Sequence, residues 1–169
     1  LDMEPIRDSI LYVSGQIDLT MGGPGFDVFE PNDNYVHLYV PKTEFTRAEF
    51  RRMIYQWKPR MEQDVTLGVF DCPDAAQAMP KRITSTSPLQ AFNLMNSPFM
   101  VQQAAAFAER VEKEADGLLE SRIARAYALA LCREPSQDET ARARELSDRF
   151  GLAALCRALL NSSEFVYLN

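Results

Sequence analysis

Apolar and polar residues recur with a helical period over most of the second half of the chain. Beyond Ser87, apolar residues return every three or four positions, which places them on one face of an α-helix. The pattern predicts five helices, near residues 88–96, 99–115, 118–131, 137–150 and 152–160. Leu89, Phe92, Leu94 and Met95 predict that the first of these is buried. Because the connections are short, neighbouring helices are expected to run antiparallel in a bundle.

Two helix starts lie directly behind one another at the beginning of this region. Ser87-Pro88 and Ser97-Pro98 each combine a capping hydroxyl with a proline at a position that needs no amide hydrogen. Gln90, three residues after Ser87, completes a capping box. Ser136 and Glu139 repeat this spacing before the fourth helix of the series. The chain must therefore bend sharply near residue 96.

The first 86 residues show a weaker and more mixed pattern. Residues 4–14 predict a helix with Ile6, Ile10 and Val13 on one side, and Gly15 is expected to end it. The glycine-rich stretch 19–25 fits no phosphate-binding motif and is expected to be a connector. Residues 35–40 predict a short strand. Residues 51–57 predict either its antiparallel partner in a small β-hairpin, which we favour, or part of a helix that begins near residue 46.

Residues 58–86 contain three prolines and few periodic apolar positions, so they predict a long ordered loop. The expected fold class is therefore mainly α. An antiparallel helical bundle over 87–169 joins an N-terminal helix, a small β-hairpin and a long ordered loop over 1–86. We expect one domain, 1–169, cut from a larger multidomain protein, because the chain begins without Met and enters a helical pattern at once.

Composition narrows the possible functions. The chain has 169 residues, 46% of them hydrophobic and 25% charged, as in a globular domain with one core. The formal net charge of −6 argues against binding nucleic acid or an anionic membrane surface. The apolar runs are too short for membrane insertion. We therefore predict no nucleic-acid partner and no membrane span.

Cysteine and histidine give little support for metal chemistry. Cys72, Cys132 and Cys156 form no Cys-x-x-Cys pair, and His37 has no second histidine beside it. We predict no metal site. Cys132 and Cys156 fall in apolar helical patterns, where a buried and unreactive thiol is expected.

Carboxylates within the long loop are the best candidates for chemistry. Asp71 and Asp74 lie three residues apart in a proline-containing turn, so they could bind a cation or share acid–base work. Arg82 could pair with either acid or bind an anion. The plainer interpretation is structural: Asp74 caps a short helix, Asp71 bonds local amides, and Arg82 forms an ion pair.

Two further groups of residues could bind a ligand. Ser85 and Ser87 stand at a helix start, whose free amides favour an anion, although capping accounts for the same residues. Trp57 could stack on a sugar or lie at an interface, although such a residue more often belongs to the core. The candidate ligand-binding set is thus Asp71, Asp74, Arg82, Ser85, Ser87 and Trp57, with no catalytic residue assigned.

Several segments together resemble a planctomycete-associated C-terminal domain of unknown function. They are Arg51-Arg52-Met53-Ile54-Tyr55, Phe70-Asp71-Cys72-Pro73-Asp74, Arg82 through Ala91, Leu94 through Phe99, and Leu159 through Phe165. The N-terminal helix and the segment 21–24 also look similar to the region that precedes this domain. Cys132-Arg133-Glu134-Pro135 resembles the family's Gly-Arg-Pro turn with Cys-Arg-Glu substituted.

The resemblance implies a bacterial, extracytoplasmic parent protein of several domains. Many members of the family also carry a c-type cytochrome module. It brings no established catalytic residues. The chain has no Cys-x-x-Cys-His motif, so we expect no cofactor in it, and any haem would lie in upstream domains.

These observations favour a non-catalytic accessory or interaction domain, which packs against other domains of its parent or a protein partner. The alternative is a carboxylate-dependent hydrolase, or a binding domain, that acts on carbohydrate or another polymer. A pocket that holds Asp71, Asp74 and Arg82 together beside Trp57 or Tyr55 would favour the alternative. The same polar groups used in caps and ion pairs would favour the accessory domain.

Overall fold

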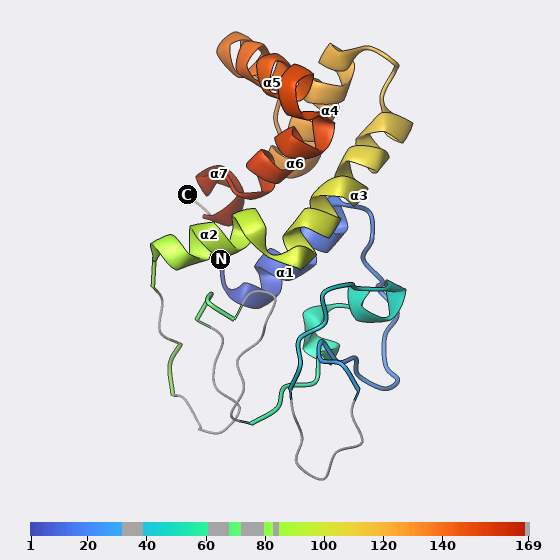
Figure 1. Cartoon of the computed structure of the whole chain (residues 1–169), viewed down its shortest axis with the longest axis vertical. Helices are drawn as coiled ribbons and strands as arrows, with labels where there is room; N and C mark the ends of the chain where they lie inside the picture. Colours follow the sequence, from blue (N-terminus) through green and yellow to red (C-terminus); the bar gives the residue numbers. More distant parts are fainter. Residues whose placement is uncertain (32–38, 61–67, 72–79, 83–84, 168–169) are drawn as a thin grey trace.

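A computed structural model of the chain describes residues 1–31, 39–60, 68–71, 80–82 and 85–167 (Figure 1). The described part is mainly helical, as predicted. Its helices are α1 (Met3–Val13), α2 (Pro88–Asn96), α3 (Pro98–Glu114), α4 (Leu119–Leu131), α5 (Gln137–Phe150), α6 (Leu152–Leu160) and α7 (Ser163–Val166). Two short 3₁₀ helices, η1 (Arg47–Phe50) and η2 (Met53–Tyr55), lie between α1 and α2.

The predicted helix starts are confirmed. The Ser87 hydroxyl accepts a hydrogen bond from the Gln90 amide at 3.4 Å, and the Gln90 side chain accepts one from the Ser87 amide at 3.0 Å. The Ser97 hydroxyl caps α3, since it accepts from the Met100 amide at 3.3 Å. Since Ser97 both ends α2 and caps α3, the bend between the two helices is built from one residue.

Helices α3, α4, α5 and α6 pack on one another, with α6 against both α3 and α5. Helix α1 crosses α3 on the side away from α5 (Figure 1). The two ends of the chain meet at α7, where the Leu1 amino group donates to the Val166 carbonyl at 3.0 Å. The short helices α2 and α7 therefore lie beside the start of the chain (Figure 1).

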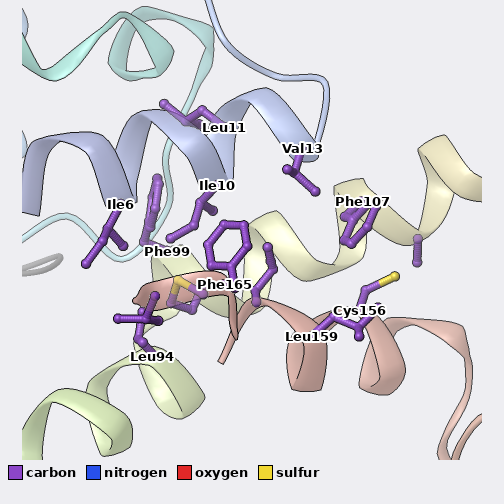
Figure 2. Close-up of a cluster of buried hydrophobic side chains, with 14 of the residues drawn as sticks. Ile6, Ile10, Leu11, Val13, Leu94, Phe99, Phe107, Cys156, Leu159 and Phe165 are labelled. Carbon is purple, nitrogen blue, oxygen red and sulfur yellow. The ribbon is translucent and has the colours of Figure 1, made fainter. Parts of the chain in front are cut away.

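The hydrophobic core lies where α1, α3, α6 and α7 converge (Figure 2). Ile6 and Ile10 from α1 point toward Phe99 of α3 and Phe165 of α7. All four are at most 8% exposed. Buried residues before α2 belong to the same cluster, namely Phe26, Val28, Phe29, Phe45, Phe50, Met53 and Phe70. The first part of the chain is thus packed onto the helices.

The predicted β-hairpin is wrong for the described residues. Residues 51–57 form η2 with flanking extended backbone, and they make isolated parallel bridges to Asp18 and Phe26. Of the predicted strand 35–40, residues 35–38 lie outside the described part. Val40 accepts from the Glu30 amide, so its partner is the preceding segment and not residues 51–57. A period-two pattern cannot say which segment a short extended stretch will meet.

The buried side chain of Arg7 holds η1 and the residue that follows it against α1. Arg7 is fully buried and donates to the carbonyls of Glu49 and Arg51, the second at 2.9 Å. Its guanidinium also lies over the rings of Phe26 and Phe99, 4.9 and 5.3 Å from their centroids. Arg7 therefore supplies hydrogen bonds to the Glu49 and Arg51 carbonyls, which lie outside any β-sheet.

Arg51 organises the glycine-rich segment. Its guanidinium donates to the carbonyls of Thr20, Gly22 and Pro24, the first at 3.0 Å. Tyr55 supports the same turn, because its hydroxyl accepts from the Gly22 amide at 2.8 Å. The stretch 19–25 is thus a connector that is held by the side chains of Arg51, which follows η1, and Tyr55 of η2.

Two predictions of burial are wrong. On α2 only Leu94 is buried among the apolar residues that predicted a buried helix: Leu89 is 59% exposed, Phe92 65% and Met95 38%. Cys132 is also exposed, and it ends α4 in a left-handed conformation with φ 55°. Cys156, in contrast, is fully buried, as predicted.

Candidate functional site

Asp71 reaches across to the residues before α2. One carboxylate oxygen accepts from the Ser85 amide at 2.6 Å, and the other accepts from the Ser85 hydroxyl at 2.8 Å. Asp71 itself has φ 54°, a conformation that Asp and Asn adopt more readily than most residues. The described contacts of Asp71 therefore hold two chain segments together.

Gln90 joins this contact to the α2 cap. While its carbonyl oxygen accepts from the Ser87 amide, its Nε2 donates to the carbonyls of Val69 and Ser85, at 3.0 and 3.3 Å. The side chain is only 5% exposed. One buried amide thus connects the Asp71–Ser85 pair, the Ser87 cap and the segment before Asp71.

Arg82 turns toward the start of α1. Its guanidinium makes a two-pronged pair with Glu4 at 2.6 and 2.7 Å and donates to Asp2 at 3.2 Å. The hydrogen bond from Arg82 lowers the pKa of Glu4, because it stabilises the carboxylate. Arg82 lines a cavity of about 580 Å³ with Asp2, Glu4 and Asp8, and Asp71 does not line that cavity.

Trp57 lies apart from both groups. Its ring is near that of Tyr39, with centroids 6.1 Å apart, and the residue is 48% exposed. It lines neither the Arg82 cavity nor the cavity beside Asp71. The prediction that Trp57 would more often belong to the core does not describe this half-exposed ring.

The structure therefore brings together only part of the predicted set. Asp71 and Ser85 are in contact, and Ser87 joins them through Gln90. Arg82 and Trp57 lie elsewhere. Asp74 and His37 fall outside the described residues. Among the described residues, no three histidine, cysteine or acidic side chains come close enough to hold a metal ion.

An exposed apolar strip on α2, formed by Leu89, Phe92 and Met95, is the feature that sequence reasoning missed. It belongs to a stretch without any charged residue, from residue 83 to residue 108. This uncharged stretch could have indicated an exposed apolar surface from the sequence alone. A chain that is one quarter charged normally places charges on the solvent side of a surface helix.

A charged cluster between α4, α5 and α7 also went unpredicted. Arg133 donates to both oxygens of Glu139, at 2.7 and 2.9 Å, and to both oxygens of Glu164, at 2.7 Å. Its guanidinium lies 5.6 Å from the centroid of the Tyr127 ring. These bonds lower the pKa of Glu139 to about 2 and also lower the pKa of Glu164. The cluster joins the end of α4 to the start of α5 and to α7.

The described part of the chain is a small helical fold in which Asp71 and Arg82 bond to other segments of the same chain. The chain belongs to the PSD1 family, described as protein of unknown function (DUF1553), whose model matches residues 1–147. The predicted resemblance to a domain of unknown function is thus confirmed. The match includes α1 and the glycine-rich segment, and it ends before the motif at 159–165. No curated protein and no solved structure matches the chain significantly.

Within the described residues, the helices are too short or too polar to cross a membrane.

Proposed function

We propose that this chain is an accessory domain that docks onto another protein surface, either a second domain of its parent or a separate partner. The single observation that carries the proposal is the α2 strip. Leu89, Phe92 and Met95 are 59%, 65% and 38% exposed, on a helix that is capped at its start and bears no charge.

Interface chemistry explains why such a strip is informative. The centres of protein interfaces are depleted of charged residues and enriched in aromatic residues and methionine. Single exposed apolar residues are ordinary on a protein surface, but Leu89, Phe92 and Met95 follow one another at three-residue spacing on one side of a single helix. Since α2 is held by the Ser87 cap and the buried Gln90 amide, the strip is presented on a fixed support.

The polar contacts favour this function over the hydrolase. Asp71 accepts from Ser85, Arg82 pairs with Glu4, and Ser87 caps α2. These polar groups are used in contacts that support the fold. In a hydrolase, the same groups would instead face a substrate. We also propose that the parent protein is extracytoplasmic and carries a cytochrome module. This chain itself would bind no cofactor.

Site-directed photo-crosslinking in the cells that make the protein would test the docking. A photoreactive phenylalanine at position 92 is expected to give one discrete protein adduct, because Phe92 would lie in the interface. The matched control is position 12, since Tyr12 is 64% exposed and lies on α1. A Leu89→Asp change should abolish the adduct from position 92.

Equal crosslinking from positions 92 and 12, or an adduct that survives Leu89→Asp, would contradict the docking function. Polysaccharide hydrolysis by the purified chain, lost in Asp71→Asn, would establish the enzyme instead.

A further inference from the structure

Two cavities beside α2 share five lining residues, and together we call them the groove. Their volumes are about 270 and 370 Å³, and both are lined by Phe70, Thr86, Gln90, Val166 and Tyr167. Small-molecule sites usually span about 300–1,000 Å³, so each half is at or below the lower end of that range. Each half is thus of a size suited to individual side chains.

One end of the groove is apolar. Pro88, Ala91 and Leu94 of α2 line it, opposite Val166 of α7. Leu94 and Val166 are buried, at 2% and 5% exposed, while Ala91 is exposed. The α2 strip borders this end, because Met95 contacts Asn161, which lines the same half of the groove, at 3.9 Å.

The other end is acidic. Asp2 and Asp71 line it, and no basic side chain does so among the described lining residues of either half. The Leu1 amino group, the one cationic group among the described lining residues, donates to the Val166 carbonyl. Arg82 approaches Asp2 from outside, but it shares its guanidinium with Glu4, so one arginine faces two acids.

Asp71 can accept a further donor at this end. Within the described part of the chain its carboxylate accepts only from Ser85, whereas two oxygens offer about four lone-pair sites. Tyr167 lies between the two ends and is 41% exposed. A tyrosine ring beside carboxylates favours a lysine or arginine side chain.

We propose that this groove receives an extended protein segment, with a lysine or arginine at the Asp2–Asp71 end and an apolar side chain against Leu94 and Val166. The inference rests on the docking function proposed above and adds the chemistry of the partner. Charge complementarity selects the occupant: the lining acids and the net charge of −6 attract a basic segment. Because the other end of the groove is apolar, the occupant must also carry an apolar side chain, so a free cation would not fill the groove.

Fluorescence anisotropy with short labelled peptides would test this inference. The probes are blocked hexapeptides with one lysine and one leucine, separated by zero to three serines. Matched probes carry glutamate in place of lysine, or alanine in place of leucine. At low ionic strength we expect binding of at least one lysine–leucine probe, and about tenfold weaker binding of its two matched probes.

Variants of the chain locate the binding. Asp71→Asn keeps an acceptor for Ser85 and tolerates the positive φ, so it removes charge with little change in shape. Together with Asp2→Asn it should weaken the lysine–leucine probe about tenfold. Asp148→Asn, an exposed acid on α5, is the charge-matched control and should change nothing. Ala91→Arg should also weaken binding without touching the Asp71 contacts, and Ala91→Gln is its size control.

Equal binding of the lysine and glutamate probes would overturn the inference, as would an affinity unaffected by both Asp71→Asn with Asp2→Asn and Ala91→Arg. So would the failure of every probe to bind. If position 92 still gave its specific crosslink in that case, docking through α2 would stand and only the basic segment would be wrong.

Discussion

Cys132 carries a local cost at the end of α4. Its φ of 55° lies in the left-handed region, which is unfavourable by roughly 1–2 kcal/mol for most residues with a Cβ. The same turn resembles a family motif with glycine at this position. We expect Cys132→Gly to raise the free energy of unfolding by about 1 kcal/mol, since glycine adopts positive φ freely. Chemical denaturation would measure the change.

The matched control is Cys132→Ala, which removes the thiol but keeps a Cβ. It should leave stability close to that of the parent chain. If alanine stabilised as much as glycine, the thiol and not the backbone would be responsible.

Arg7 illustrates the opposite case, a charged residue on which the fold depends. It is fully buried and donates to the Glu49 and Arg51 carbonyls. Arg7→Met preserves most of the volume but leaves both carbonyls without this donor. We expect a loss of about 2–4 kcal/mol in the free energy of unfolding, measured by urea denaturation.

Arg52 is the control for that change. Its side chain is 55% exposed and pairs with Asp8 at 3.5 Å. Arg52→Met should cost well under 1 kcal/mol. An equal loss in the two variants would show that Arg7 acts only through general electrostatics and not through its buried donors.

At the scale of elements, the helix starts could be predicted because their signals are local. Ser87 and Gln90 meet across three residues, so the sequence spacing contains the geometry. The face that α2 buries could not be predicted, because it depends on where α6 and α7 come to lie. The pattern Leu89, Phe92, Leu94 and Met95 predicted burial, but packing accommodates only Leu94.

The arrangement of the candidate site residues could not be predicted for a similar reason. Asp71 and Ser85 are separated by fourteen residues and Arg82 and Glu4 by seventy-eight, so no spacing rule connects them. Sequence reasoning could name these side chains as polar groups in a loop. It could not show that Asp71 and Arg82 point to different cavities.

The Arg133 cluster predicts how the contacts between α4, α5 and α7 respond to acid. The folded-state pKa of Glu139 is about 2, below its ordinary value near 4.5. Its contribution to stability is therefore complete above pH 4.5 and is lost as the pH falls toward 2. Glu164 shifts in the same direction. We expect the melting temperature to fall in this window, and to fall less in Glu139→Gln.

Glutamine at position 139 can still accept from the Ser136 amide, so the α5 cap survives the change. The control is Glu145→Gln on the same helix, where Glu145 is exposed and lies 3.5 Å from Arg149. It should leave the acid dependence intact. A parallel loss of acid dependence in both variants would contradict the role of the Arg133 cluster.

On the scale of the whole molecule, the core depends on packing between distant parts of the chain. The segments before α2 contribute buried aromatic residues to the cluster that α3 and α6 share. Cys156 sits in that cluster on α6, and Figure 2 shows its side chain beside Leu159 and facing Phe107 of α3. Its thiol is thus a probe of the cooperative unit and not of a local surface.

Burial raises the pKa of the Cys156 thiol to about 12, with a smaller effect from Glu112. The reactive thiolate is therefore scarce at neutral pH even where a reagent could enter. In a chain with Cys72→Ser and Cys132→Ser, we expect a thiol reagent to modify Cys156 only through global unfolding. When refolding is faster than modification, the rate should equal the thiolate reaction rate in urea multiplied by the unfolding equilibrium constant.

Urea denaturation of the same variant supplies that constant independently. Arg7→Met in this background should then accelerate labelling in proportion to its measured loss of stability, although Arg7 lies on α1 and Cys156 on α6. Labelling faster than global unfolding allows, and unchanged by Arg7→Met, would mean that α3 and α6 separate without α1. The helices would then form a unit of their own, and the first part of the chain would be packed against them without sharing their cooperativity.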